Sequence, residues 1–126
     1  MRNHVWQDHP TILLVEDELI VRLWTADELR AEGFHVVEAA NADEALALLH
    51  DAAPVDLIMT DVRMPGSMDG LGLARVAHAT RPDLKIVVVS AHMPATADDT
   101  IDAFFGKPYD PGAVATEIRK LLADGE

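Results

Sequence analysis

The sequence contains no cysteine, so thiol catalysis, thiolate metal sites and a disulfide framework are excluded. No apolar run approaches the ~20 residues that cross a bilayer, and the first residues of the chain lack the apolar core of a signal peptide. We therefore expect a soluble, cytoplasmic protein with no membrane partner.

Positive charge is also scarce. Ten Lys and Arg residues stand against 22 Asp and Glu residues, which gives a formal net charge of −12 at pH 7. No Lys or Arg occurs between Arg30 and Arg63. A surface of this kind repels phosphate backbones, so no nucleic-acid partner is expected.

The length of 126 residues is that of one domain, and such a chain can bury roughly two thirds of the surface that it exposes when unfolded. Its apolar content of 49% and charged content of 25% are typical of a globular protein. The sequence has no internal repeat and no low-complexity segment. We expect residues 1–9 to form an N-terminal tail and residues 10–126 to form the domain.

Short apolar runs alternate with helical patterns along the chain. The runs predict five strands, at residues 11–15, 35–39, 55–60, 84–89 and 103–106. Apolar spacing, caps and breakers predict five helices, at residues 19–32, 42–53, 71–79, 93–101 and from 111 onward. Short connections between alternating strands and helices produce a parallel sheet covered on both faces. The predicted fold class is therefore α/β, with a doubly wound five-stranded parallel sheet.

Helical periodicity also predicts which residues pack on the sheet. Asn41, with Glu44 three residues later, is expected to cap the second helix, and Asp110 the last one. The residues expected on the buried faces of the first and third helices are Ile20, Val21, Trp24 and Leu29, and Leu73, Val76 and Ala77.

Polar residues follow the predicted strands where each one ends. Glu16 and Asp17 follow the first, Asp61 the third, Ser90 the fourth and Lys107 the fifth. With strand order 2-1-3-4-5, the first and third strands are neighbours and their three carboxylates converge. Two carboxylates ~5 Å apart repel by roughly 3 kcal/mol at an effective dielectric constant of ~20, so the group needs positive charge. Lys107 offers one charge, and an oxygen-ligand site of this kind is what Mg²⁺ prefers.

Other kinds of site are less compatible with these residues. A nucleotide or flavin site needs a Gly-, Ser- or Thr-rich loop after the first strand, where residues 16–18 are Glu-Asp-Glu. A hydrolase similar to the haloacid dehalogenase family would carry a second carboxylate two residues after Asp61, where Arg63 stands. A small magnesium-dependent phosphohydrolase or a ligand-binding flavodoxin-like domain stays open as an alternative. Taken singly, Asp17 has the ordinary alternative role of a cap for the first helix.

Four spaced motifs occupy the predicted strand ends. They are Leu14-Val15-Glu16-Asp17-Glu18, Asp61-Val62-Arg63-Met64-Pro65 with Met68-Asp69-Gly70, Val89-Ser90-Ala91, and Lys107-Pro108. Together they resemble the receiver domain of bacterial two-component response regulators, the family of the chemotaxis regulator, over residues 10–124. The resemblance implies a flavodoxin-like fold.

The resemblance implies that Asp61 accepts a phosphoryl group from a histidine kinase or a phosphotransfer protein. It implies that Asp17, Asp61 and the backbone carbonyl of Arg63 bind Mg²⁺ directly, and that Glu16 acts through water. The domain would not be an enzyme, because it catalyses only its own phosphorylation and dephosphorylation. Chemistry agrees with these roles, since phosphoryl transfer depends on positioning and charge neutralisation.

The resemblance also implies a conformational switch. Ser90 and Lys107 would bind the phosphoryl oxygens, Phe104 would be the switch aromatic, and the bond before Pro108 would be cis. Once Asp61 carries a phosphoryl group, the Ser90 hydroxyl can move toward it and vacate space into which Phe104 turns. We expect a downstream protein target to recognise the changed surface. A second copy of the domain, in a homodimer, is a further expected partner.

The sequence departs from the family pattern in two places. Residues 65–70 carry one residue more than usual, and the interval from Ser90 to Lys107 is several residues short, which predicts a shortened fourth helix and a nonstandard output surface. Arg63 and His92 each lie two residues past a site residue, at positions that border the phosphoryl group in this family. We hypothesise that both side chains affect the lifetime of the phosphoryl group.

Three hypotheses for the whole protein follow. The first is a stand-alone, single-domain response regulator, since the given chain stops at Glu126 with no DNA-binding module. The second is a receiver that belongs to a longer regulator or hybrid kinase. The third, from a different class, is the magnesium-dependent phosphohydrolase.

Overall fold

The computed structural model describes residues 9–51, 54–64, 66, 68–91 and 100–124. Its strands form one parallel sheet in the order β2-β1-β3-β4-β5. They are β1 (Thr11–Val15), β2 (His35–Ala39), β3 (Leu57–Asp61), β4 (Lys85–Ser90) and β5 (Ala103–Gly106). The predicted doubly wound α/β fold and its strand order are confirmed.

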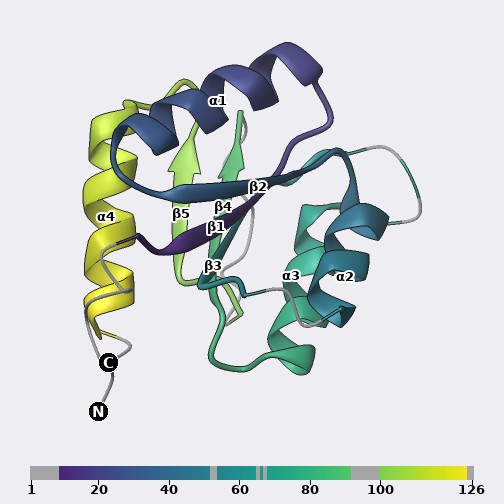
Figure 1. Ribbon diagram of the computed structural model, residues 1–126. Coiled ribbons are helices and arrows are strands. Elements are labelled where there is room, and N and C mark those ends of the chain that lie inside the picture. Colours follow the sequence, from purple (N-terminus) through teal and green to yellow (C-terminus); the bar gives the residue numbers. More distant parts are fainter. Residues whose placement is uncertain (1–8, 52–53, 65, 67, 92–99, 125–126) are drawn as a thin grey trace.

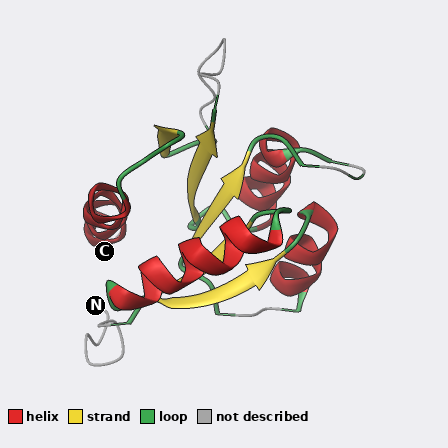
Figure 2. Cartoon of the chain, turned by 90° about the horizontal axis from the view of Figure 1, so that it is seen from above, coloured by secondary structure: helices red, strands yellow, loops and turns green. Residues whose placement is uncertain are grey.

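Helices cover both faces of this sheet (Figure 1). One face carries α1 (Leu19–Ala31) and α4 (Pro111–Asp124), and the other carries α2 (Ala42–His50) and α3 (Gly70–Thr80). Figure 2 shows the sheet from above, between the two pairs of helices. No helix within the described ranges has the length and apolarity that a membrane crossing requires.

Two sequence predictions fall mainly outside the described residues. The short fourth helix was predicted at residues 93–101, and residues 92–99 are not described; Thr100 and Ile101 are not helical. The predicted tail at residues 1–9 lies outside the described residues except for His9.

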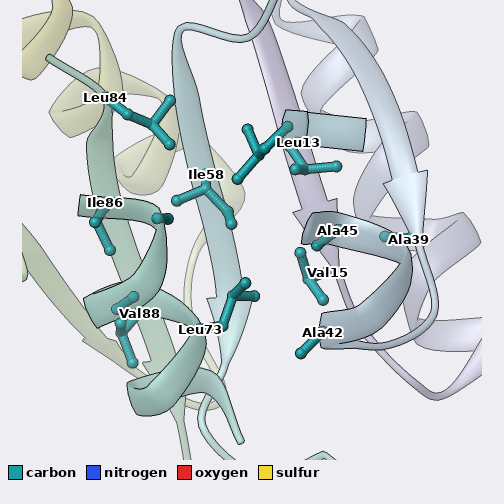
Figure 3. Packing of buried hydrophobic residues seen from close by; sticks show 13 residues of the cluster. Leu13, Val15, Ala39, Ala42, Ala45, Ile58, Leu73, Leu84, Ile86 and Val88 are labelled. Atoms are coloured by element: carbon teal, nitrogen blue, oxygen red, sulfur yellow. The ribbon is translucent and has the colours of Figure 1, made fainter. Parts of the chain in front are cut away.

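The core has two layers, one on each face of the sheet, because alternate residues of a strand point to opposite faces. The layer shown in Figure 3 joins strand residues to α2 and α3, and includes Leu13, Val15, Ile58, Ile86, Val88, Ala45 and Leu73. The layer beneath α1 and α4 includes Ile12, Leu14, Leu57, Met59, Val87, Leu29, Val114 and Ile118. Burial on both faces explains why the strands are nearly continuous apolar runs.

The predicted helix caps are present. Asn41 Oδ1 accepts a hydrogen bond of 2.8 Å from the Glu44 amide, and Glu44 Oε1 accepts one of 2.8 Å from the Ala40 amide. Asp110 Oδ2 accepts a hydrogen bond of 3.3 Å from the Ala113 amide at the start of α4.

The predicted buried face of α1 is wrong over its first two turns. Ile20 is 74% exposed and Trp24 is 52% exposed, whereas Thr25 and Ala26 are buried; Leu29, in the last turns, is buried as predicted. Five of the first six residues of the helix are apolar, so periodicity cannot define which side packs on the sheet. On α3, Leu73 and Ala77 are buried as predicted, but Val76 is 36% exposed.

Several boundaries also differ from the prediction by a few residues. β3 begins at Leu57 and includes Asp61, which pairs with Val89 of β4. β4 runs from Lys85 to Ser90, and so also carries its polar residue within the strand. α2 ends at His50, three residues before the predicted end, and its last turn includes the bond from the Asp51 amide to the Ala47 carbonyl.

Candidate functional site

The parallel topology brings the polar residues of four strand ends to one edge of the sheet. Asp61 is the last residue of β3 and pairs with Val89, and Ser90 is the last residue of β4. Glu16 directly follows β1, and Lys107 directly follows β5. Because β1, β3, β4 and β5 are consecutive in the sheet, these side chains lie along the same edge and can contact one another.

Three carboxylates converge at this edge, as the strand order predicts. Glu16, Asp17 and Asp61 each place a carboxylate oxygen within 4.8 Å of the others. Glu16 is buried, Asp61 is half-buried and Asp17 is exposed. At such a separation each pair repels by about 3 kcal/mol at an effective dielectric constant of about 20. We call these three residues the acidic group.

Lys107 is the cation that the acidic group holds. Its Nζ donates a hydrogen bond of 2.5 Å to Asp61 Oδ2 and one of 3.2 Å to Glu16 Oε1. Burial lowers the pKa of Lys107, but the hydrogen bond to Asp61 and the charges of Glu16 and Asp61 outweigh it and raise this pKa overall. The lysine is therefore charged, and three carboxylates with one ammonium leave an excess of two negative charges.

Glu16 is the most deeply placed member of the group. Burial raises the pKa of its carboxyl group, while the Glu18 amide and Lys107 oppose that rise. The Glu18 amide donates a hydrogen bond of 3.1 Å to Glu16 Oε2. The Glu16 amide in turn donates one of 3.0 Å to the Ala39 carbonyl of β2. Both the backbone and the carboxylate of Glu16 are thus held in place.

Asp17 belongs to the acidic group and is not a helix cap. The N-cap of α1 is Glu18, and no side chain makes a capping hydrogen bond there. The alternative role of Asp17 as a cap is therefore wrong. Its exposed carboxylate gives the acidic group an opening to solvent.

The donor atoms of the acidic group fit a hard divalent cation. All three are carboxylate oxygens, and their excess of two negative charges equals the charge of one Mg²⁺ ion. A shallow cavity of about 400 Å³ lies beside Asp17 and is also lined by Arg63 and Asp69. It leaves space for the waters that Mg²⁺ usually keeps. The Arg63 amide donates a hydrogen bond of 3.2 Å to Asp61 Oδ1, so residue 63 lies against the Asp61 carboxylate.

The remaining predicted site residues occupy the β4 and β5 end of the same edge. Ser90 is buried, and its carbonyl accepts a hydrogen bond of 2.8 Å from the Lys107 amide. The Lys107–Pro108 peptide bond is cis. Phe104 is half-buried and packs against the core layer of α2 and α3. His92 lies outside the described residues.

Sequence reasoning missed the role of Gly70, which it treated as a loop residue. Gly70 is buried, and a Cβ atom added to it would lie 1.9 Å from the Asp61 carbonyl oxygen. Its amide donates a hydrogen bond of 2.8 Å to the Val62 carbonyl. Asp69, whose Oδ1 accepts a 2.9 Å hydrogen bond from the Gly72 amide, caps the same helix. The available signal was the Asp-Gly pair itself, since a helix start with a small residue permits close backbone approach.

Thr60 and Arg22 were also missed. Thr60 Oγ1 donates a hydrogen bond of 2.9 Å to the Asp61 carbonyl, and Arg22 Nη1 donates one of 2.9 Å to the Glu16 carbonyl. Each side chain therefore holds the backbone of an acidic residue. No sequence signal identified these contacts.

Comparisons with known proteins agree with the observed fold. The family model described as response regulator receiver domain matches residues 12–119. The chain is 38% identical over 122 residues to the sensor kinase CckA of Brucella abortus, a match that covers 89% of this chain and 12% of the kinase. It is 34% identical over 116 residues to the response regulator receiver protein CpdR of Brucella abortus, covering 88% of this chain and 95% of that protein.

A solved structure gives the same result. The response regulator protein TrrA of Thermotoga maritima, in complex with Mg²⁺ and BeF, is similar with a TM-score of 0.81 and 29% identity. That match covers 89% of this chain and 98% of TrrA. Since the family model spans most of the chain and the strand order is the predicted one, the chain belongs to the response regulator receiver domain family.

Proposed function

We propose that Asp61 accepts a phosphoryl group from the phosphohistidine of a histidine kinase or phosphotransfer protein. The observation that carries this proposal is the setting of Asp61, half-buried at the end of β3, bound by Lys107 and within 4.8 Å of two further carboxylates. A receiver domain is a signalling phosphoacceptor rather than an enzyme with an external substrate. The phosphohydrolase alternative has no comparable support.

In the transfer step, a carboxylate oxygen of Asp61 attacks the phosphorus atom of the donor. An O–P bond forms as the P–N bond of the phosphohistidine breaks, and the electron pair of that bond stays on the imidazole nitrogen. Ser90 and Lys107 would then bind the phosphoryl oxygens. Asp17, Asp61 and the Arg63 carbonyl, with Glu16 through water, would hold Mg²⁺, which neutralises charge on the transferring group.

The donor protein is proposed to dock on the exposed side of α1, beside the acceptor. The exposed apolar residues there are Leu19 (54%), Ile20 (74%), Leu23 (44%) and Trp24 (52%). A groove of about 560 Å³ runs between this side of α1 and the segment after β5, and it is lined by Ile20, Trp24, Lys107, Pro108 and Tyr109 among others. Lys107 belongs to both the groove and the site. A protein seated in the groove therefore lies within reach of Asp61.

The acceptor residue is tested by phosphorylation with a small acyl phosphate. The protein is incubated with Mg²⁺ and the donor, and the mass of the intact chain is measured. We expect one added phosphoryl group in the parent protein and none in Asp61→Asn. Asp27→Asn is the control, because Asp27 is an exposed acid on α1 and should not affect the reaction. An equal mass gain in Asp61→Asn contradicts the assignment.

The docking surface is tested with two donors. Ile20→Asp should slow transfer from a phosphohistidine protein, yet leave phosphorylation by the small donor unchanged. Val76→Asp is the matched control, since Val76 is an exposed apolar residue on the opposite face of the sheet. Equal transfer rates for Ile20→Asp and Val76→Asp refute docking on α1.

Two settings for such a domain occur among the relatives. The receiver protein CpdR is matched over nearly its whole length, whereas the sensor kinase CckA is matched over 12% of it. We favour a stand-alone regulator that passes its state to a downstream protein. Sequencing the gene through its stop codon distinguishes it from a receiver within a longer regulator.

A further inference from the structure

Arg22 reaches back from the first turns of α1 to the peptide bond that joins two acidic residues. Its Nη1 donates a hydrogen bond of 2.9 Å to the Glu16 carbonyl, and its Nε donates one of 3.3 Å to Glu38 Oε1 on β2. Its side chain is only 15% exposed. A charged side chain that is this well covered and has two fixed acceptors is held in one conformation.

We propose that Arg22 is a positioning residue for the metal-binding carboxylates, an inference that rests on the proposed function. The Glu16 carbonyl and the Asp17 amide belong to one planar peptide unit. By holding the carbonyl, Arg22 sets the direction in which the chain continues to Asp17. The Ala39 carbonyl accepts the Glu16 amide on the other side, so this part of the backbone is held twice.

Asp17 depends on its backbone more than the other two acids do. Glu16 and Asp61 have their carboxylates bound by Lys107 and by backbone amides. The exposed Asp17 carboxylate makes no hydrogen bond or ion pair with the residues that the structure describes. Its position relative to the other two carboxylates therefore follows from the peptide that Arg22 holds.

The charge of Arg22 does not explain the proposed role, because Glu38 and Asp27 together balance Arg22 and Arg30. Glu38 also accepts a hydrogen bond of 3.3 Å from Arg30 Nη2. The geometry of the guanidinium group is what matters, since its fork can bond a carbonyl and a carboxylate at once. A lysine keeps the charge but lacks that fork.

The experiment measures Mg²⁺ binding by calorimetry in the absence of any phosphodonor. Arg22→Lys is expected to bind Mg²⁺ about tenfold more weakly than the parent, as is typical when an outer partner of a metal ligand is lost. Arg30→Ala is the matched control, because it removes the other arginine of Glu38 without touching Glu16. Its dissociation constant should stay within about twofold of the parent value, because Arg30→Ala removes only the surface ion pairs of Arg30 with Asp27 and Glu38. Thermal unfolding of the metal-free proteins shows that each variant is folded.

The outcomes separate this inference from the proposed function. If the parent protein binds no Mg²⁺, the proposed function fails. If the parent binds and Arg22→Lys binds equally well, or if Arg30→Ala loses as much affinity as Arg22→Lys, the positioning role is overturned. Should Arg22→Lys not fold, Arg22→Gln replaces it, since a glutamine keeps one planar donor but cannot reach both acceptors. The same loss is expected, and parent-like affinity in that variant overturns the inference.

Discussion

Replacing Gly70 by alanine should displace Asp61, the proposed phosphoacceptor, without adding or removing a polar group. The added Cβ atom would lie 1.9 Å from the Asp61 carbonyl oxygen, 2.8 Å from its carbonyl carbon and 2.9 Å from Val62 Cα. All three atoms are backbone, so no side-chain rotation can relieve the overlap. Ordinary contact begins at 3.4 Å, so the start of α3 and the end of β3 must separate by about 1.5 Å.

The energetic cost has two sources. Overpacking of this kind costs about 1–3 kcal/mol, and loss of the 2.8 Å hydrogen bond from the Gly70 amide to the Val62 carbonyl adds about 1 kcal/mol. We therefore expect Gly70→Ala to lower the free energy of unfolding by about 2–4 kcal/mol, measured by urea denaturation of the metal-free protein. Phosphorylation of Asp61 by the small donor should also slow, because the carboxylate moves with its backbone.

Gly112 provides the control for this substitution. A Cβ atom at Gly112 would come no closer than 3.6 Å to Asp110 Oδ2, which is ordinary contact. Gly112→Ala should leave stability unchanged or raise it by up to about 1 kcal/mol, because alanine is the better helix former. If Gly70→Ala proved as stable and as readily phosphorylated as Gly112→Ala, the close approach of α3 to Asp61 would be refuted.

Three further predictions concern the charges of the site. Lys107→Met leaves Glu16 and Asp61 without their cation and should lower the free energy of unfolding by about 2 kcal/mol at neutral pH. The pKa of Lys107 is raised above its ordinary value of 10.5, so the stability that the ion pair contributes is present below pH 10.5 and is lost as the pH rises further. Above pH 10.5, Lys107→Met should therefore lose less stability with rising pH than the parent protein does. Equal losses in the two proteins contradict the ion pair. Mg²⁺ at about 100 times its dissociation constant should stabilise the parent protein by about 2.7 kcal/mol. A chelator should reverse this stabilisation, and Asp61→Asn should weaken it. A parent melting curve that does not respond to Mg²⁺ contradicts the metal site. Arg63→Ala and His92→Ala should each change the decay rate of phosphorylated protein, and lifetimes equal to that of the parent would dispose of the tuning hypothesis.

The excess of two negative charges also bears on how the site is maintained. Compensating contacts on two of the three close carboxylates reduce the cost of their mutual repulsion. Lys107, the Glu18 amide and the Arg63 amide supply these contacts for Glu16 and Asp61. This arrangement is the preorganisation that the proposed cation binding and phosphoryl transfer require.

Much of this arrangement could be predicted because its signals are local. Five short runs rich in apolar residues define the strands, and polar residues follow four of them directly. In a parallel sheet, a residue at a strand's carboxyl end must lie at one edge, so Glu16, Asp61 and Lys107 could be placed together before any coordinates were known. The Asn41 and Glu44 cap was predictable for the same reason, since its partners are three residues apart.

Other features could not be predicted because they depend on how elements pack. The first turns of α1 are apolar on nearly every side, and only contact with the sheet selects Thr25 and Ala26, next to the predicted Leu29, for burial. The exposed Ile20 and Trp24 therefore became apparent only in the folded chain.

The sequence by itself determined the alternating α/β pattern, the parallel sheet and the presence of acids and a lysine at its edge, because each depends on residue type and short-range spacing. Only the tertiary structure decided the distances between the acids, that Gly70 must lack a side chain beside Asp61, and that Arg22 holds the Glu16 carbonyl while bound to Glu38. These contacts join different elements, and their distances depend on strand register and helix placement. Such quantities are set by the packing of the whole chain, and no local spacing encodes them.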